Sequence, residues 1–590
     1  MTRPAGRQST LERTLDPFTL EIVKDKLAAT ADEMAVVLAR TSMSPIVYEV
    51  LDFACGLTNE RAQVVAQTNG LTLFTGTFGP QVESVLRRYR EELEPGDIYM
   101  TNNPYEGGTH ICDVCLIAPI FSDAELVAFA VSITHWIEIG GAVPGSIPVD
   151  ATEIFQEGLL FPCIRLVRGG QANESVRQMI RGNVRLPRLA LGDLDAGTAA
   201  VRIGERRVRE ACERYGVRAL RGAMKETLER GERMSRAELA TIPNGVYKAE
   251  DFIDGDGLSD DPLPIRVEVQ VEEQTLTADF EGCAPQARGP INCSWGALHS
   301  ACKTVFRAIT NPQAPSNDGC FRPFTILCSP GTVFTATPPA PTGWYYEGSA
   351  FASELVWKAL APVIPERLGA GSYLSLCAAY ITGTNSETGE AFVLAEPADG
   401  GWGGSPTLDG ESALIATTDG DTYNFPVEVV EARYPVLVER YALNTADGSG
   451  AGRRRGGFGV VREYRIVNED GAVSYGSVSG AVRRPWGLFG GRPGTNNYLE
   501  YIKGDGERLR RGRVRGIDLA QGDVMRIVTG AGGGFGDALE REPERVRADV
   551  RRGYLSCNRA RDDYGVALAP EGLAVDHEAT ARLRAQGKRS

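Results

Sequence analysis

The runs VCLIAPI at Val114–Ile120 and LVAFAVSIT at Leu126–Thr134, joined by FSDAE, carry the strongest fold signal in the chain. Both runs are rich in β-branched and other apolar residues, which is typical of buried strands. The polar connector Phe121–Glu125 has the length of a hairpin loop. We therefore predict an antiparallel hairpin at the centre of a sheet.

Two of the four histidines flank this hairpin. His110 lies in GGTHICD, three residues before Asp113, and His135 lies in SITHWIEIGG. If the turn is centred on Asp123, the residue numbers of each cross-strand pair add up to about 246. This register places the side chains of His110, Asp113 and His135 close together. The pairs expected from this register are Asp113 with Ile133 and Ile111 with His135.

These three side chains form a candidate metal site. Opposed residues have Cβ atoms about 4.5–5.5 Å apart, so two imidazoles and a carboxylate can converge on one ion. Such a donor set suits a divalent transition metal, namely Zn, Mn or Fe, and leaves positions open for water and substrate. His110 and Asp113 would face opposite sides of a regular strand, so Gly107-Gly108 must hold His110 in irregular backbone. The alternative is a pair of ordinary hydrogen-bonded strand-end histidines.

Two further acids are candidate catalytic residues. Glu138 follows His135 by three residues and is suited to act as a general base or to orient a ligand imidazole. Asp52, in EVLDFAC, is either a site acid or a buried turn cap. The CxxC pair Cys112 and Cys115 could instead carry redox or zinc chemistry, but the chain has no second CxxC.

Periodicity along the rest of the chain predicts a multidomain α+β protein, with mixed or antiparallel sheets, packed helices and a β-rich C-terminal unit. Apolar residues recur at helical spacing over Thr19–Arg40, and at a period of two from Gly245 onward. Beyond Pro426 we predict strands, including Val427–Tyr434. The predicted divisions are a disordered leader (1–16), an N-terminal α/β region with the hairpin (17–190), a helical segment (191–244), a central α+β region (245–426), a β-rich region (427–570) and a tail (571–590).

Composition excludes several function classes. The chain has 590 residues and a formal net charge of −14, with 63 basic residues scattered among 77 acidic ones, so nucleic-acid binding is not expected. No run of about eighteen apolar residues is present, which argues against a membrane span. The N-terminus lacks the apolar core of a secretory signal, so we expect a cytoplasmic protein whose twelve cysteines are reduced.

Two glycine-rich segments are similar to phosphate loops in composition only. Gly448–Gly457 and Gly530–Gly536 both lack the G-x-G-x-x-G spacing, and neither ends in G-K-[ST]. Tight turns are the simpler interpretation of both. The run Arg453–Arg455 is suited either to steering an anion or to forming a solvated surface.

Several blocks of sequence together resemble the hydantoinase B/oxoprolinase family, from Asp16 to Val566. Relatives in this family include components of ATP-dependent N-methylhydantoinases and of acetone and acetophenone carboxylases. The blocks that carry the resemblance are Asn102–His110, Asp279–Gln286, Asn317–Cys320 and Gly532–Asp537.

The resemblance implies that His110, Asp113 and His135 are metal ligands. This agrees with the hairpin argument. The chain departs from the commoner family pattern at three positions close to them. The pattern has a second histidine where Trp136 stands, and aspartates where Glu138 and Asn103 stand.

The resemblance also implies a partner, a hydantoinase A-like subunit that uses ATP and phosphorylates the small-molecule substrate in a hetero-oligomer. A metal-activated water would then open the ring of a hydantoin or lactam, with Glu138 as proton acceptor. One alternative is a subunit of a biotin-independent ketone carboxylase, in which a phosphorylated enol attacks carbon dioxide. A second alternative is a non-catalytic scaffold for an ATPase.

Overall fold

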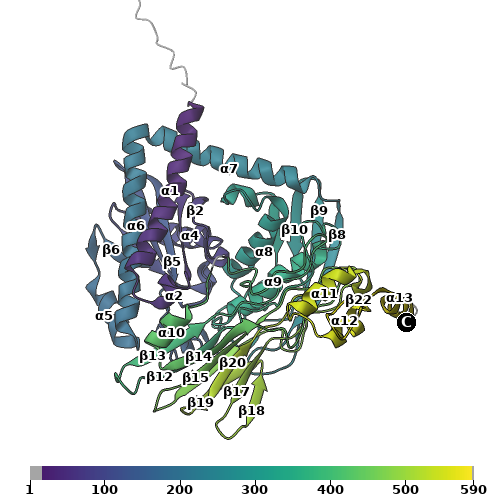
Figure 1. Cartoon of the computed structure of the whole chain (residues 1–590). Helices are drawn as coiled ribbons and strands as arrows, with labels where there is room; N and C mark the ends of the chain where they lie inside the picture. The colour runs from purple at the N-terminus through teal and green to yellow at the C-terminus, as the bar shows by residue number, and fades with distance from the viewer. Residues whose placement is uncertain (1–15, 421, 588–590) are drawn as a thin grey trace, which may run out of the picture.

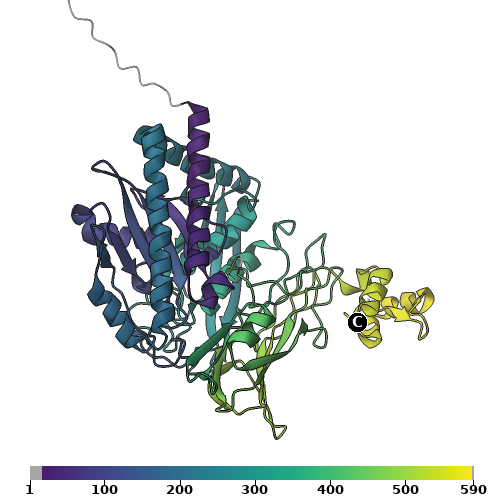
Figure 2. The same cartoon turned by 60° about the vertical axis from the view of Figure 1, so that its left-hand side comes forward.

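The structure is a computed structural model that describes residues 16–420 and 422–587. The chain contains helices and several antiparallel or mixed sheets, so the predicted α+β class is confirmed. Figures 1 and 2 show a sheet region under long helices, a strand-rich region below it and a small helical cluster near the C-terminus. Apart from Asp16, the predicted leader lies outside the described residues, as do the last three residues of the tail.

The predicted hairpin, β4 and β5, lies in the middle of a seven-stranded sheet of order β2-β1-β5-β4-β3-β6-β7. Neighbouring strands are antiparallel. Both central strands are buried over most of their length, on both faces, which accounts for their continuous apolar sequence. The strands are β1 (Phe53–Asn59), β2 (Val64–Gln67), β3 (Ile98–Thr101), β4 (Asp113–Ser122), β5 (Glu125–His135), β6 (Ile164–Arg168) and β7 (Gln171–Ala172).

Two long helices, α1 and α6, run side by side across this sheet (Figures 1 and 2). Asp16 caps α1 by accepting a hydrogen bond from the Thr19 amide at 3.1 Å. Gly204 allows α6 to approach β5, because a Cβ there would lie 2.7 Å from the Ala130 Cβ. The helices of this half are α1 (Pro17–Thr41), α2 (Pro45–Tyr48), α3 (Thr72–Thr75), α4 (Phe78–Tyr89), α5 (Glu174–Asn183), α6 (Pro187–Tyr215) and α7 (Val217–Leu239).

A mixed four-stranded sheet, of order β11-β10-β9-β8, forms the centre of the chain. From Ile265 onward, residues of β9 alternate between buried and exposed, as the period of two predicts. Helices α8 and α9 pack against each other, and α9 also packs on β8 and β9. The elements are β8 (Gly245–Ile253), β9 (Leu263–Glu272), β10 (Thr275–Asp279), α8 (Trp295–Thr310), β11 (Phe324–Leu327) and α9 (Tyr345–Leu360).

Two antiparallel sheets, β13-β12-β16-β19 and β14-β15-β20-β17-β18, build the β-rich part. The strand predicted at Val427–Tyr434 is wrong: this segment is helix α10 (Val427–Arg433), which buries only Val430 and packs on β14. Packing of one face there overrides the strand preference of its valines. The strands are β12 (Ala379–Thr384), β13 (Ala391–Glu396), β14 (Val436–Leu443), β15 (Val460–Ile466), β16 (Ala472–Ser477), β17 (Tyr498–Ile502), β18 (Arg508–Arg511), β19 (Arg513–Leu519) and β20 (Val524–Val528).

The chain ends in a small cluster with its own core, built around Val546, Ala560 and Tyr564 (Figure 2). Among the described residues, no helix is long and apolar enough to cross a bilayer. The elements of the cluster are α11 (Pro543–Arg551), α12 (Cys557–Tyr564), β21 (Ala567–Leu568), β22 (Val575–Asp576) and α13 (His577–Gly587).

The register of the hairpin differs from the prediction by two residues. Asp113 pairs directly with His135, and not with Ile133. The turn is the tight pair Asp123-Ala124, with Asp123 at φ 53°, and the register shifts once more between Ile120 and Phe121. Because a turn centre and a bulge both alter the count, spacing alone could not give the pairing.

Candidate metal centre

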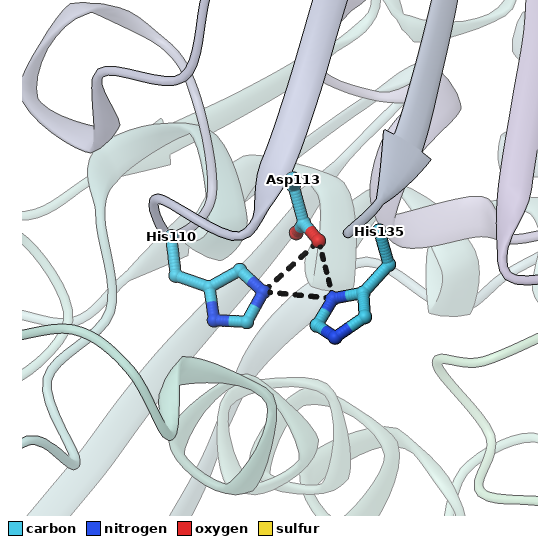
Figure 3. A group of neighbouring side chains, drawn as sticks. All are labelled: His110, Asp113 and His135. Atoms are coloured by element: carbon cyan, nitrogen blue, oxygen red, sulfur yellow. Dashed lines mark hydrogen bonds and ion pairs between the residues drawn. The ribbon is translucent and has the colours of Figure 1, made fainter. Parts of the chain in front are cut away.

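Three side chains meet at the open end of the hairpin (Figure 3). Asp113 begins β4, His135 ends β5, and His110 lies in the loop before β4. His110 Nε2 and His135 Nδ1 each lie 2.9 Å from Asp113 Oδ1, and the two nitrogens lie 3.3 Å apart. The three ligand atoms therefore face one point.

The donor set fits a transition-metal ion. Ligand atoms with bonds of about 2.0–2.2 Å lie about 2.8–3.6 Å from one another around an octahedral or tetrahedral ion. The three observed separations, from 2.9 to 3.3 Å, fall in that range. Two ring nitrogens and a carboxylate oxygen also direct lone pairs at one another, an arrangement that needs a proton or a cation between them.

Burial and charge favour a cation at this point. The exposed fractions of His110, Asp113 and His135 are 1%, 3% and 6%. Burial by itself raises the pKa of Asp113, but the adjacent imidazoles outweigh it and hold that pKa well below its usual range. Burial lowers the pKa of His135, whereas Asp52 and Asp113 overcome this effect and raise it. The ionised form of this buried carboxylate is thus stabilised by positive charge, which either a protonated ring or a metal ion can supply.

Glycines shape the loop that carries His110. Gly107 has φ +101°, and a Cβ there would lie 2.5 Å from the Pro80 Cβ. The Gly108 carbonyl accepts a hydrogen bond from Ser294 Oγ, 2.6 Å away, at the start of α8. This irregular backbone lets His110 and Asp113 face the same point although they are three residues apart.

A second layer of hydrogen bonds orients two of the three ligands, His110 and Asp113. His110 Nδ1 donates to the Gly343 carbonyl at 2.9 Å, which leaves the Nε2 lone pair of the neutral ring for a metal. The Gly343 amide is held in turn by Glu157 Oε1 at 2.7 Å. The second oxygen of Asp113, Oδ2, accepts hydrogen bonds from the hydroxyls of Thr109 and Tyr345.

A small cavity of about 50 Å³ opens beside His110 and His135. Asp52 and Asp419 line it, and burial raises the pKa of Asp52 to about 7 and that of Asp419 well above its ordinary value. Tyr346 lines it as well, and within the described residues its buried hydroxyl has no hydrogen-bond partner. The cavity thus offers acids and a phenol to a ligand next to the candidate metal.

Glu138 lies beside this arrangement and not in the cavity lining. Its Oε1 accepts hydrogen bonds from the Gly140 amide, Ser146 Oγ and Arg185 Nη1, at 2.8, 3.1 and 2.8 Å. Its Oε2 accepts one from the Arg185 amide at 2.6 Å. The carboxylate therefore fastens the loop that follows His135 to Arg185.

The other residues near the triad that the sequence singled out are buried. Asn103 accepts a hydrogen bond from the Tyr105 amide at 3.1 Å and so caps the short turn before Gly107. The side chain of Trp136 is buried in the core. Cys112 and Cys115 are buried free thiols.

Sequence reasoning missed three residues around the site: Tyr345, Tyr346 and Asp419. They come from α9 and from a loop after β13, more than 200 residues beyond the hairpin. The only local signals are the aromatic run WYY at 344–346 and the turn-like TTDGD at 417–421. Neither has a spacing that points to a site.

The chain matches the family model of hydantoinase B/oxoprolinase over residues 16–538. It is 34% identical to a protein of Pseudomonas sp. strain NS671 that is provisionally named as a component of a D-/L-hydantoinase, over 97% of this chain and 98% of that protein. It is 31% identical to the beta chain of caprolactamase from Pseudomonas jessenii, over 97% and 99% of the two chains.

Solved structures agree with these matches. The crystal structure of ATP-dependent caprolactamase from Pseudomonas jessenii superposes with a TM-score of 0.91 at 28% identity, covering 97% of this chain and all of that one. Acetone carboxylase shares the fold, with a TM-score of 0.91 at 21% identity over 98% of this chain and 83% of that one. The resemblance inferred from the sequence blocks is confirmed, and the chain belongs to the hydantoinase B/oxoprolinase family.

Proposed function

We propose that this chain is the metal-binding subunit of an ATP-dependent enzyme that hydrolyses a cyclic amide such as a hydantoin or a lactam. The observation that carries the proposal is the triad His110, Asp113 and His135, with ligand atoms 2.9–3.3 Å apart in a buried site. The family supports the reaction class, because the matched relatives include an ATP-dependent caprolactamase, whose name denotes action on a lactam.

In this proposal the three ligands hold a Zn, Mn or Fe ion. When bound, such an ion supplies Lewis acidity toward water and the substrate oxygen. Asp52, which lines the cavity beside His135, accepts the proton of the attacking water. We assign this role to Asp52 and not to Glu138, because all the hydrogen bonds of the Glu138 carboxylate hold its own loop.

The proposal includes a hydantoinase A-like partner that uses ATP, in a hetero-oligomer. An unactivated amide resists attack by water, whereas phosphorylation of its oxygen by the partner makes the amide carbon more electrophilic. Water adds to this carbon, and the ring C–N bond breaks to leave a free amine and an acyl phosphate. A second water molecule then releases the phosphate and leaves a carboxylate. Two relatives, of the hydantoinase and caprolactamase types, are named as single subunits of larger enzymes, which supports the existence of a partner. The glycine-rich segments of this chain, which lack the spacing of nucleotide loops, are consistent with ATP binding elsewhere.

The test is to purify the chain together with its ATP-binding partner and to measure ring opening and ADP release with a hydantoin, 5-oxoproline and caprolactam. We expect ATP-dependent opening of at least one ring, lost by several orders of magnitude in His135→Ala. The control is His577→Ala, which alters an exposed histidine of α13. Turnover of a ketone with bicarbonate, or full activity of His135→Ala, would contradict the proposal in favour of a carboxylase or a scaffold.

A further inference from the structure

A second cavity, of about 750 Å³, lies between the glycine-rich loop at Gly448, strand β18 and helix α12, and it shares no lining residue with the cavity beside the triad. Its volume is in the range of small-molecule sites. Five arginines and two aspartates line it, in a chain whose net charge is −14. The lining side chains that carry these charges are Arg484, Arg492, Arg510, Arg511, Arg559, Asp447 and Asp563.

The positive charge of this arginine pocket is only partly neutralised. Arg492 and Arg559 share one carboxylate, that of Asp563, at 2.6 and 3.2 Å. In the described part of the chain, Arg484 and Arg511 lie within ion-pair distance of no carboxylate; their guanidinium groups donate only to the Asn496 amide oxygen and to a backbone carbonyl. The pocket therefore presents guanidinium groups whose charge no carboxylate of the described residues offsets, and these groups are free to bind an anion.

Two of the arginines are held in fixed positions. The Arg510 guanidinium stacks on the ring of Tyr498, 3.5 Å from its centroid. Arg559 crosses Gly448, where a Cβ would lie 1.3 Å from its Nη1, so only glycine leaves room for this guanidinium. Planar guanidinium groups held in place are suited to paired hydrogen bonds with phosphate oxygens.

A buried hydroxyl gives an independent indication of a ligand. Ser449 lines the pocket and is 7% exposed, yet among the described residues its Oγ has no hydrogen-bond partner. A buried hydroxyl without a partner is costly, so such groups commonly meet a ligand or water. Ser449 lies in the glycine-rich segment Gly448–Gly457, whose glycine spacing does not match the known nucleotide-binding loops.

We propose that the arginine pocket binds a small phosphorylated anion, a diphosphate or a polyphosphate, through its arginines and Ser449 Oγ. This site is separate from the proposed metal centre and does not depend on the proposed function. The pocket is a partly open hollow, and a concave site of this volume suits a small molecule better than the flatter surface of a protein partner.

The experiment is isothermal titration calorimetry of the full chain with pyrophosphate at about 150 mM salt, where weak surface charge effects are screened. We expect saturable binding with a Kd below about 1 mM. Arg484→Ala/Arg511→Ala should weaken binding more than about tenfold, and Ser449→Ala about threefold to tenfold. Ser449→Ala should melt no lower than the parent protein, because its hydroxyl has no partner to lose.

The matched control is Arg508→Ala/Arg552→Ala, which removes two exposed arginines outside the pocket and should leave the Kd unchanged. Absence of saturable binding by the parent protein would overturn the proposal. An equal loss of binding in the control would also overturn it, because it would mark binding as nonspecific. Binding of a hexaglutamate peptide without binding of pyrophosphate would overturn it in favour of a protein partner.

Discussion

The two oxygens of Asp113 have different partners. Oδ1 faces the two imidazoles, whereas Oδ2 accepts hydrogen bonds from the hydroxyls of Thr109 and Tyr345. The hydroxyls fix the plane of the carboxylate, so the direction of its metal-facing oxygen is set before an ion arrives.

We expect Thr109→Val to weaken zinc binding about tenfold to 100-fold, because the carboxylate loses one of its two anchors. Competition with a chromophoric chelator measures this affinity. The control is Thr227→Val, which removes a hydroxyl of α7 that donates to the Ala223 carbonyl far from the hairpin. Equal affinities of Thr109→Val and the parent protein would show that the anchor does not position the ligand.

Glu138 and Arg185 form an ion pair at 2.8 Å in which the carboxylate is fully buried. We expect Glu138→Gln and Arg185→Gln each to lower the free energy of unfolding by about 1–3 kcal/mol, through loss of the same contact. Because they share it, the double variant should lose less than the sum, as a denaturation double-mutant cycle measures. A large loss of turnover in Glu138→Gln at unchanged stability would instead return Glu138 to the role of proton acceptor.

At the scale of elements, the N-terminus of α8 supports the loop that carries His110. Ser294 Oγ accepts a hydrogen bond from the Ala297 amide at 3.0 Å and donates one to the Gly108 carbonyl at 2.6 Å. One hydroxyl thus caps the helix and ties it to the triad.

Ser294→Ala should therefore lower both stability, by about 1–2 kcal/mol, and zinc affinity. Ser556→Ala is the matched control, since Ser556 caps α12 through the Arg559 amide and lies in the separate C-terminal cluster. Its stability cost should come without a change in zinc affinity. If both variants bound zinc like the parent protein, the link from α8 to the site would be refuted.

The same helix holds an acid-sensitive histidine. Burial, with a smaller effect of Lys303, lowers the pKa of His299 to about 3, and its ring packs 3.8 Å from that of Trp295. The unfolded chain takes up this proton near pH 6.5, so the stability due to the neutral ring is complete above pH 6.5 and declines as the pH falls toward 3. His299→Gln should flatten this decline, by about 2 kcal/mol at pH 4, in urea denaturation at several pH values. An unchanged slope would mean that His299 does not titrate differently on folding.

The spacing of apolar residues correctly predicted those elements in which that spacing matches the buried face. The α1 stripe, the β4–β5 hairpin and the alternation of β9 follow directly from residue spacing. Helix α10 did not, because its valines favour a strand, whereas the segment forms a helix that buries Val430 and packs on β14. The predicted hairpin register was wrong because the bulge near Ile120 cannot be recognised from the sequence.

At the scale of the whole molecule, the candidate site is assembled from segments far apart in the chain. The hairpin brings His110, Asp113 and His135 together by local pairing, and these could be proposed from spacing and family blocks. Asp419 and Tyr346 reach the same cavity only through the packing of later parts of the chain, which no local period encodes. The role of the three ligands stays a prediction, because their geometry fits an ion without identifying it.

The most direct test of the account is the metal content of the purified full chain after zinc, manganese or iron reconstitution, measured by inductively coupled plasma mass spectrometry. We expect about one tightly bound ion per chain, and less than about 0.1 in His110→Ala, Asp113→Ala and His135→Ala, with His577→Ala like the parent protein. A parent protein that binds no ion, or triad variants that keep a full equivalent, would contradict the central claim that these three side chains form a metal centre.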